Sequence, residues 1–96
     1  MHTALEAFKA RQLVSPSARL ADLPQYSPEQ LFFLSWGNAW CGTINLEMLK
    51  WTLQYDPHAP IQFRVNVPLM NMPDFAKAFH CPAGSKMNPK ERCAVW

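Results

Sequence analysis

Apolar and polar positions along the chain predict mainly short helices. Leu5, Phe8 and Leu13 are separated by polar residues, a spacing that fits a short amphipathic helix over residues 4–13. Two prolines in the next stretch, Ser15 to Pro24, fix the backbone and remove amide donors. We therefore expect a helix followed by a connecting loop.

The clearest helix start lies at Ser27. Its hydroxyl can cap the first turn, Pro28 occupies a position where a missing N–H costs nothing, and Gln30 can reach back as in a capping box. The predicted helix continues to Trp40 and is apolar almost all round, which is typical of a helix buried on most sides. A chain of 96 residues supplies little material to cover it.

The second half of the chain has a mixed pattern. Residues 46–53 fit either a short helix or an irregular apolar turn, whereas residues 63–69 alternate apolar and polar, as a half-buried strand does. That strand places Arg64 and Asn66 together on its non-core face. A second capped helix is expected over residues 73–79. The predicted fold class is mainly α with a short β-strand.

Composition indicates that something covers this chain. Hydrophobic residues make up 49% and charged residues 17%, which is too apolar for a disordered tail and rather apolar for a free-standing small domain. The net charge is +2 and the Lys and Arg residues are scattered, so nucleic acid is not an expected partner. The longest apolar run, Leu31 to Trp36, is far below the roughly 20 residues of a membrane helix, and no secretion signal is evident.

Three cysteines, Cys41, Cys81 and Cys93, are an odd number, so at least one cannot pair within the chain. Reduced thiols and disulfides to another segment both remain open from composition alone. A metal site formed by Cys81, Cys93, His58 and His80 is disfavoured, because their spacing fits no closed zinc pattern.

Several linked motifs resemble the last part of the neprilysin and endothelin-converting-enzyme family, over residues 26–96. They are the segments 29–33, 40–43, 56–60 with 63–65, 75–81, 87–89, and the closing Cys93-Ala94-Val95-Trp96. The resemblance implies that residues 1–96 are the C-terminal segment of a larger, thermolysin-like and mostly helical peptidase domain. The remainder of that ectodomain is then the expected partner.

Members of this family are zinc endopeptidases that cleave peptides on the amino side of hydrophobic residues. They are mostly cell-surface ectodomains on one N-terminal anchor, and some are secreted. Their zinc is held by two His of an H-E-x-x-H helix and a downstream Glu, with the motif's Glu as general base. That motif is absent from this sequence, so the resemblance implies a zinc enzyme whose metal is held upstream of this chain, and a chain that is inactive alone.

The resemblance also assigns roles to single residues. His58 matches the family's donor to the oxyanion of the tetrahedral intermediate, and Arg64 matches the arginine that binds the carbonyl of the residue after the scissile bond. Ala39 and Trp40 match the wall of the apolar pocket for that residue, where the small Ala39 departs from the usual bulkier aliphatic and favours larger aromatic residues. Cys41, Cys81 and Cys93 match cysteines that pair outside this segment.

Each role has a simpler alternative. His58 also fits a solvated turn histidine, Arg64 a surface arginine, and Ala39 ordinary helix packing. At the level of the whole chain, the alternative to a peptidase segment is a short secreted, non-catalytic binding module derived from that family. A pseudo-enzyme parent that lost its zinc ligands is a further possibility, against which His58 and Arg64 argue.

Overall fold

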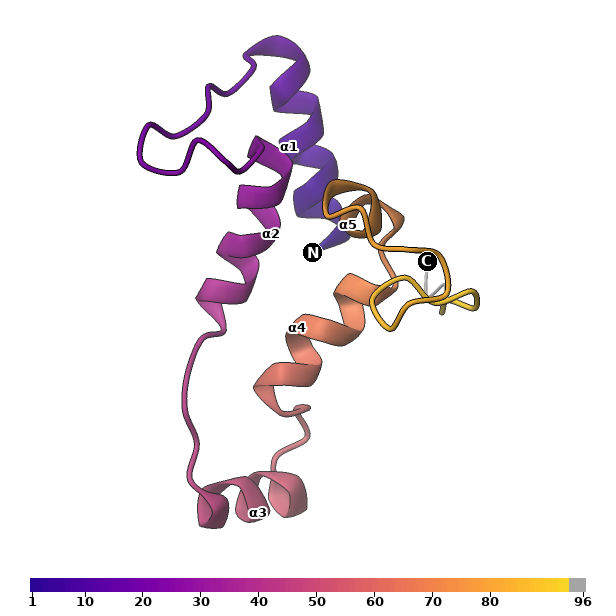
Figure 1. The fold of residues 1–96 in the computed structure, drawn as a ribbon. Coiled ribbons are helices and arrows are strands. Elements are labelled where there is room, and N and C mark those ends of the chain that lie inside the picture. The colour runs from indigo at the N-terminus through magenta and orange to yellow at the C-terminus, as the bar shows by residue number, and fades with distance from the viewer. Residues whose placement is uncertain (94–96) are drawn as a thin grey trace.

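Five helices joined by loops make up the computed structural model, which describes residues 1–93 (Figure 1). They are α1 (His2–Val14), α2 (Pro28–Ala39), α3 (Leu46–Tyr55), α4 (Ile61–Met70) and α5 (Pro73–Ala78). Helices α1 and α5 lie together with the C-terminal segment at one end, and α3 lies at the opposite end, beyond α2 and α4 (Figure 1). The mainly helical prediction is confirmed.

A small core joins four parts of the chain. Leu5 of α1, Phe33 of α2, Leu69 of α4 and Met72, just before α5, are all buried and in one cluster. Phe33 meets the ring of Phe75 edge to face, with centroids 5.4 Å apart. The core therefore lies where α1, α2, α5 and the end of α4 meet, and α3 contributes no buried residue to it.

The capping box at Ser27 forms as predicted. The Gln30 amide donates to the Ser27 hydroxyl at 3.2 Å, and the Ser27 amide donates to the Gln30 side-chain oxygen at 2.9 Å. The same Gln30 side chain donates to the carbonyl of Ala78, at the end of α5. One short motif therefore both starts α2 and ties it to α5.

Replacing Ser27 by alanine is expected to weaken the first turn of α2 by about 1 kcal/mol, because one amide loses its acceptor. Amide hydrogen exchange in that turn is expected to become about five-fold faster. Ser35→Ala, on the exposed surface of the same helix, is the matched control and leaves exchange in the first turn unchanged. Equal protection in the two variants would show that the cap contributes nothing.

The predicted strand over residues 63–69 is wrong, since this stretch lies inside helix α4 and no strand occurs in residues 1–93. Val65 and Leu69, four residues apart, turn toward the core, whereas Phe63 and Val67, also four apart, are exposed. The apolar residues of these two rows alternate along the sequence with polar ones, so a helix here shows the same period of two as a strand. Arg64 and Asn66 consequently do not share a face, because residues two positions apart on a helix point about 200° away from each other.

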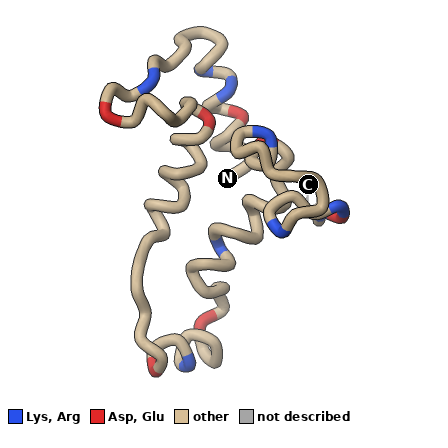
Figure 2. The backbone as a smooth tube through the Cα atoms, in the orientation of Figure 1, with Lys and Arg blue, Asp and Glu red and all other residues tan. Residues whose placement is uncertain are grey.

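Much apolar surface remains uncovered. Leu13, near the end of α1, is 88% exposed although the pattern placed it on the helix's apolar side. Large hydrophobic side chains are also exposed on α2, α3 and α4, among them Leu34, Trp51, Leu53 and Phe63. Charges are sparse here: Glu29 is the one charged residue of α2 and Arg64 that of α4 (Figure 2). An exposed apolar surface of this extent is typical of a surface that contacts another part of a protein or a partner.

None of the described helices has the length and apolar character needed to span a bilayer. The last three residues of the predicted closing motif, 94–96, lie outside the described residues.

Candidate functional site

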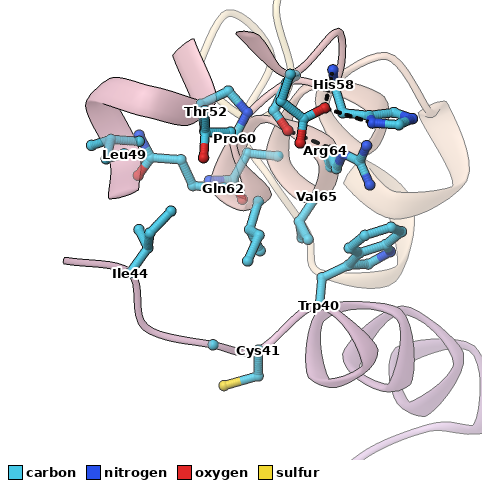
Figure 3. A pocket seen from close by; sticks show the side chains of 15 residues that line it. Trp40, Cys41, Ile44, Leu49, Thr52, His58, Pro60, Gln62, Arg64 and Val65 are labelled. Carbon is cyan, nitrogen blue, oxygen red and sulfur yellow. Dashed lines mark hydrogen bonds and ion pairs between the residues drawn. The ribbon is translucent and has the colours of Figure 1, made fainter. Parts of the chain in front are cut away.

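A pocket of about 720 Å³ opens between the segment after α2, helix α3 and the start of α4. Its apolar lining includes Ile44, Leu49 and Val65, and its polar lining includes His58 and Arg64 (Figure 3). The fold thus brings His58, Arg64 and Trp40, three of the predicted site residues, around one cavity. Ala39, the last residue of α2, is exposed and does not line this pocket.

The loop between α3 and α4 positions His58. Asp56 ends α3, and its carboxylate accepts one hydrogen bond from the backbone amide of His58 at 2.8 Å and contacts the ring Nδ1 at 2.7 Å (Figure 3). An Asp that binds the amide two residues on forms an Asx turn, which suits the proline between them. The imidazole is therefore oriented by a carboxylate and is itself 67% exposed.

The pKa of Asp56 is lowered from its ordinary 3.8, first by the hydrogen bond from the His58 backbone amide and next by that from the His58 side chain. Arg64 adds a smaller Coulomb contribution in the same direction. Asp56 is consequently ionised at neutral pH and can only accept hydrogen bonds. The His58 Nδ1 atom that faces this carboxylate must then carry the proton, and Nε2 is left to face outward.

Arg64 extends from the first turn of α4 and is held at two points. Its Nε donates to the carbonyl of Ala59 at 3.0 Å, and the centre of its guanidinium lies 4.7 Å from the centroid of the Trp40 ring (Figure 3). Trp40 is the C-cap residue directly after α2, so this contact joins the end of α2 to α4 at one side of the pocket. Arg64 is half-buried rather than free on the surface.

Asp56 is the functional candidate that reasoning from the sequence missed. Its signal was present, because an Asp followed two residues later by a His, with Pro between them, favours an Asx turn that directs the carboxylate onto the His.

All three cysteines are free thiols in this structure, Cys41 and Cys93 exposed and Cys81 half-buried. Cys41 follows Trp40 and lines the pocket (Figure 3). The prediction that they pair with cysteines outside the chain stays a prediction.

Zinc chemistry requires at least three protein ligands around the metal. Across residues 1–93, no group of three or more His, Cys, Asp or Glu side chains is close enough to hold a metal ion. Asp56 and His58 form only a pair. The residues of this pocket do not fit a zinc site.

Comparison with known proteins agrees with the sequence motifs. The model of peptidase family M13 matches residues 1–95. The chain is 47% identical over 96 residues to Neprilysin-1 of Caenorhabditis elegans, covering 95% of this chain and 13% of that protein. It is 48% identical over 81 residues to Neprilysin-2 of Drosophila melanogaster, covering 84% of this chain and 10% of that protein.

An endothelin-converting enzyme homolog of Locusta migratoria is 51% identical over 71 residues, covering 74% of this chain and 10% of that protein. The chain therefore spans only 10–13% of the length of these curated relatives. The resemblance seen in residues 26–96 is confirmed, and the family match extends to the first helix.

Proposed function

This chain belongs to peptidase family M13, and on that premise we propose that it supplies one wall of the active site of a zinc-dependent metalloendopeptidase. The observation that carries the proposal is the convergence of His58 and Arg64 on one pocket with an apolar lining. His58 can donate from Nε2 to an oxyanion, and Arg64 can donate from its Nη atoms to a substrate carbonyl. The peptide bond cleaved is the one before a hydrophobic residue, whose side chain the apolar lining accommodates.

We assign the zinc ligands and the general base to residues outside this chain, because the described side chains do not fit a metal site. Zinc, when bound, would supply Lewis-acid activation of the attacked carbonyl. The chain alone is then inactive, and residues 1–96 form the C-terminal segment of an incomplete peptidase domain. The uncovered hydrophobic side chains of α2, α3 and α4 support this assignment, since the remainder of such a domain would bury them.

His58 acts as a charged donor in this proposal. Because Nδ1 carries its proton toward Asp56, the neutral ring has no proton on Nε2. Donation to the oxyanion therefore requires the imidazolium form, in which both ring nitrogens carry a proton. Such donors act most strongly where water is excluded, and the exposed His58 gains that environment only when substrate and the remainder of the enzyme cover the pocket.

The same proposal accounts for the cysteines and the location. Pairing of Cys41, Cys81 and Cys93 with cysteines elsewhere in the polypeptide would place the protein outside the cell or on its surface. A membrane anchor or secretion signal would then precede this segment.

The transcript upstream of the codon for Met1, read in frame, tests the proposal. An H-E-x-x-H motif and a downstream glutamate are expected, and the complete polypeptide is expected to hydrolyse peptides with a hydrophobic residue after the cleaved bond. A stop codon or a signal peptide directly before Met1 would instead favour the secreted, non-catalytic binding module.

Replacing Asp56 by asparagine is expected to lower kcat about 10- to 100-fold in the complete peptidase, because the ring of His58 loses the carboxylate that orients it. Steady-state kinetics on a peptide substrate measure the effect. Asp22→Asn, in the exposed loop before α2, is the matched control and is expected to leave kcat unchanged. Equal kcat values for the Asp56→Asn variant and the unmodified enzyme would show that His58 needs no partner.

A further inference from the structure

The contact between Trp40 and Arg64 joins the end of α2 to the start of α4 at one side of the pocket (Figure 3). Trp40 ends α2 and Arg64 lies in the first turn of α4. The guanidinium centre is 4.7 Å from the centroid of the indole ring, well within the range of a cation–π contact. The contact therefore holds these two lining residues of the pocket together (Figure 3).

Two contacts together leave Arg64 one free edge. The Nε–H group donates to the carbonyl of Ala59, and the guanidinium carbon lies over the indole ring. Within residues 1–93, no hydrogen bond or ion pair occupies the Nη atoms of Arg64. The remaining N–H groups are thus held in a defined plane and are free to bind a carbonyl oxygen.

The indole is in turn held by its own helix. Trp36, one turn earlier in α2, meets Trp40 with ring centroids 5.8 Å apart and planes inclined by 65°. Both Trp residues are half-buried. The contact with Trp36 therefore restrains the Trp40 ring, and the Trp40 ring in turn restrains the guanidinium of Arg64.

We propose that Trp40 is a positioning residue for Arg64 and acts on substrate binding through it. The stack holds the free Nη edge toward the pocket, so that substrate binding does not have to order a long, flexible side chain. This inference rests on the proposed function, in which Arg64 binds the carbonyl of the residue after the cleaved bond. It predicts that Trp40 affects substrate affinity only while Arg64 is present.

A double-mutant cycle in the complete peptidase tests the proposal. Trp40→Leu is expected to raise KM for a peptide substrate about 3- to 30-fold with little change in kcat. In the Arg64→Met background the same substitution is expected to leave KM unchanged. Trp40→Phe keeps an aromatic face and is expected to restore most of the affinity. If Trp40→Leu does not yield folded enzyme, Trp40→Phe is compared in the two backgrounds, and its smaller effect must likewise vanish without Arg64.

A spectroscopic readout separates this inference from the proposed function. The side-chain resonances of Arg64 are expected to be shifted upfield by the ring current of Trp40, and the shift is expected to disappear in Trp40→Leu. An unshifted Arg64, or an equal rise in KM in both backgrounds, would overturn the positioning role. If Arg64→Met leaves KM unchanged, the role of Arg64 in substrate binding fails, and the ring-current shift alone decides whether Trp40 holds Arg64.

Discussion

Replacing His58 by alanine is expected to lower kcat about 100- to 1,000-fold in the peptidase that contains this chain, which corresponds to the loss of one oxyanion donor. Its Nδ1 atom is engaged by Asp56 at 2.7 Å, so Nε2 is the ring atom that can face the reacting carbonyl. The effect is expected in kcat more than in KM, since the charge on the oxygen develops only in the transition state. Steady-state kinetics on a peptide substrate measure both constants.

A control substitution at another histidine shows whether the effect depends on the position of His58 or on losing any histidine. His2→Ala removes another exposed histidine, in the first turn of α1, away from the pocket. It is expected to leave both kinetic constants unchanged. The role of His58 would be contradicted if His58→Ala retained kcat, or if both variants lost it equally with the same loss of folded protein.

Replacing Phe33 by alanine is expected to cost about 3 kcal/mol of folding free energy. Phe33 is 2% exposed and forms the centre of an aromatic cluster, with the rings of Phe32, Phe75 and Phe79 within 6.4 Å of its own centroid. The cavity left behind removes contacts among α1, α2 and α5 at once. Because short chains have little stability in reserve, a loss of this size removes a large part of it.

Phe63→Ala provides the control for that measurement. Phe63 is 49% exposed on α4, so its loss is expected to change the free energy of unfolding of the chain alone by less than about 0.5 kcal/mol. Urea unfolding followed by circular dichroism compares the two variants. If the two substitutions lower the free energy of unfolding by the same amount, the aromatic cluster around Phe33 is not the core of this fold.

Most of the helices could be predicted because their signals are local. The box formed by Ser27 and Gln30 depends on atoms three residues apart, and α2 begins where that pattern places it. Pro73 marks the start of α5 as predicted, but the predicted cap is wrong, because Met72 precedes the helix and no side chain caps it. The side chain of Asn45 caps α3 through the amide of Met48, although the apolar run that follows also fitted an irregular turn.

The candidate site could be predicted only in part. Family motifs in the sequence brought His58, Arg64 and Trp40 to attention, and the fold places all three around one pocket. Their roles were implied by resemblance, whereas the contacts that orient them were not. Ala39 shows the difference: it is adjacent to Trp40 in the sequence but lies outside the pocket lining, because successive residues on a helix point about 100° apart.

The sequence by itself determined the helical character, the capped start of α2, the start of α5 at a proline and the family, since each depends on residue types at short or fixed spacings. Only the tertiary structure decided that residues 63–69 are helical. The apolar–polar alternation fits a strand, but it also fits a helix in which Leu69 is buried in the core and Phe63 is exposed. It also decided that Arg64 stacks on Trp40. Contacts of this kind join residues far apart in the sequence, and their geometry follows from how whole helices pack.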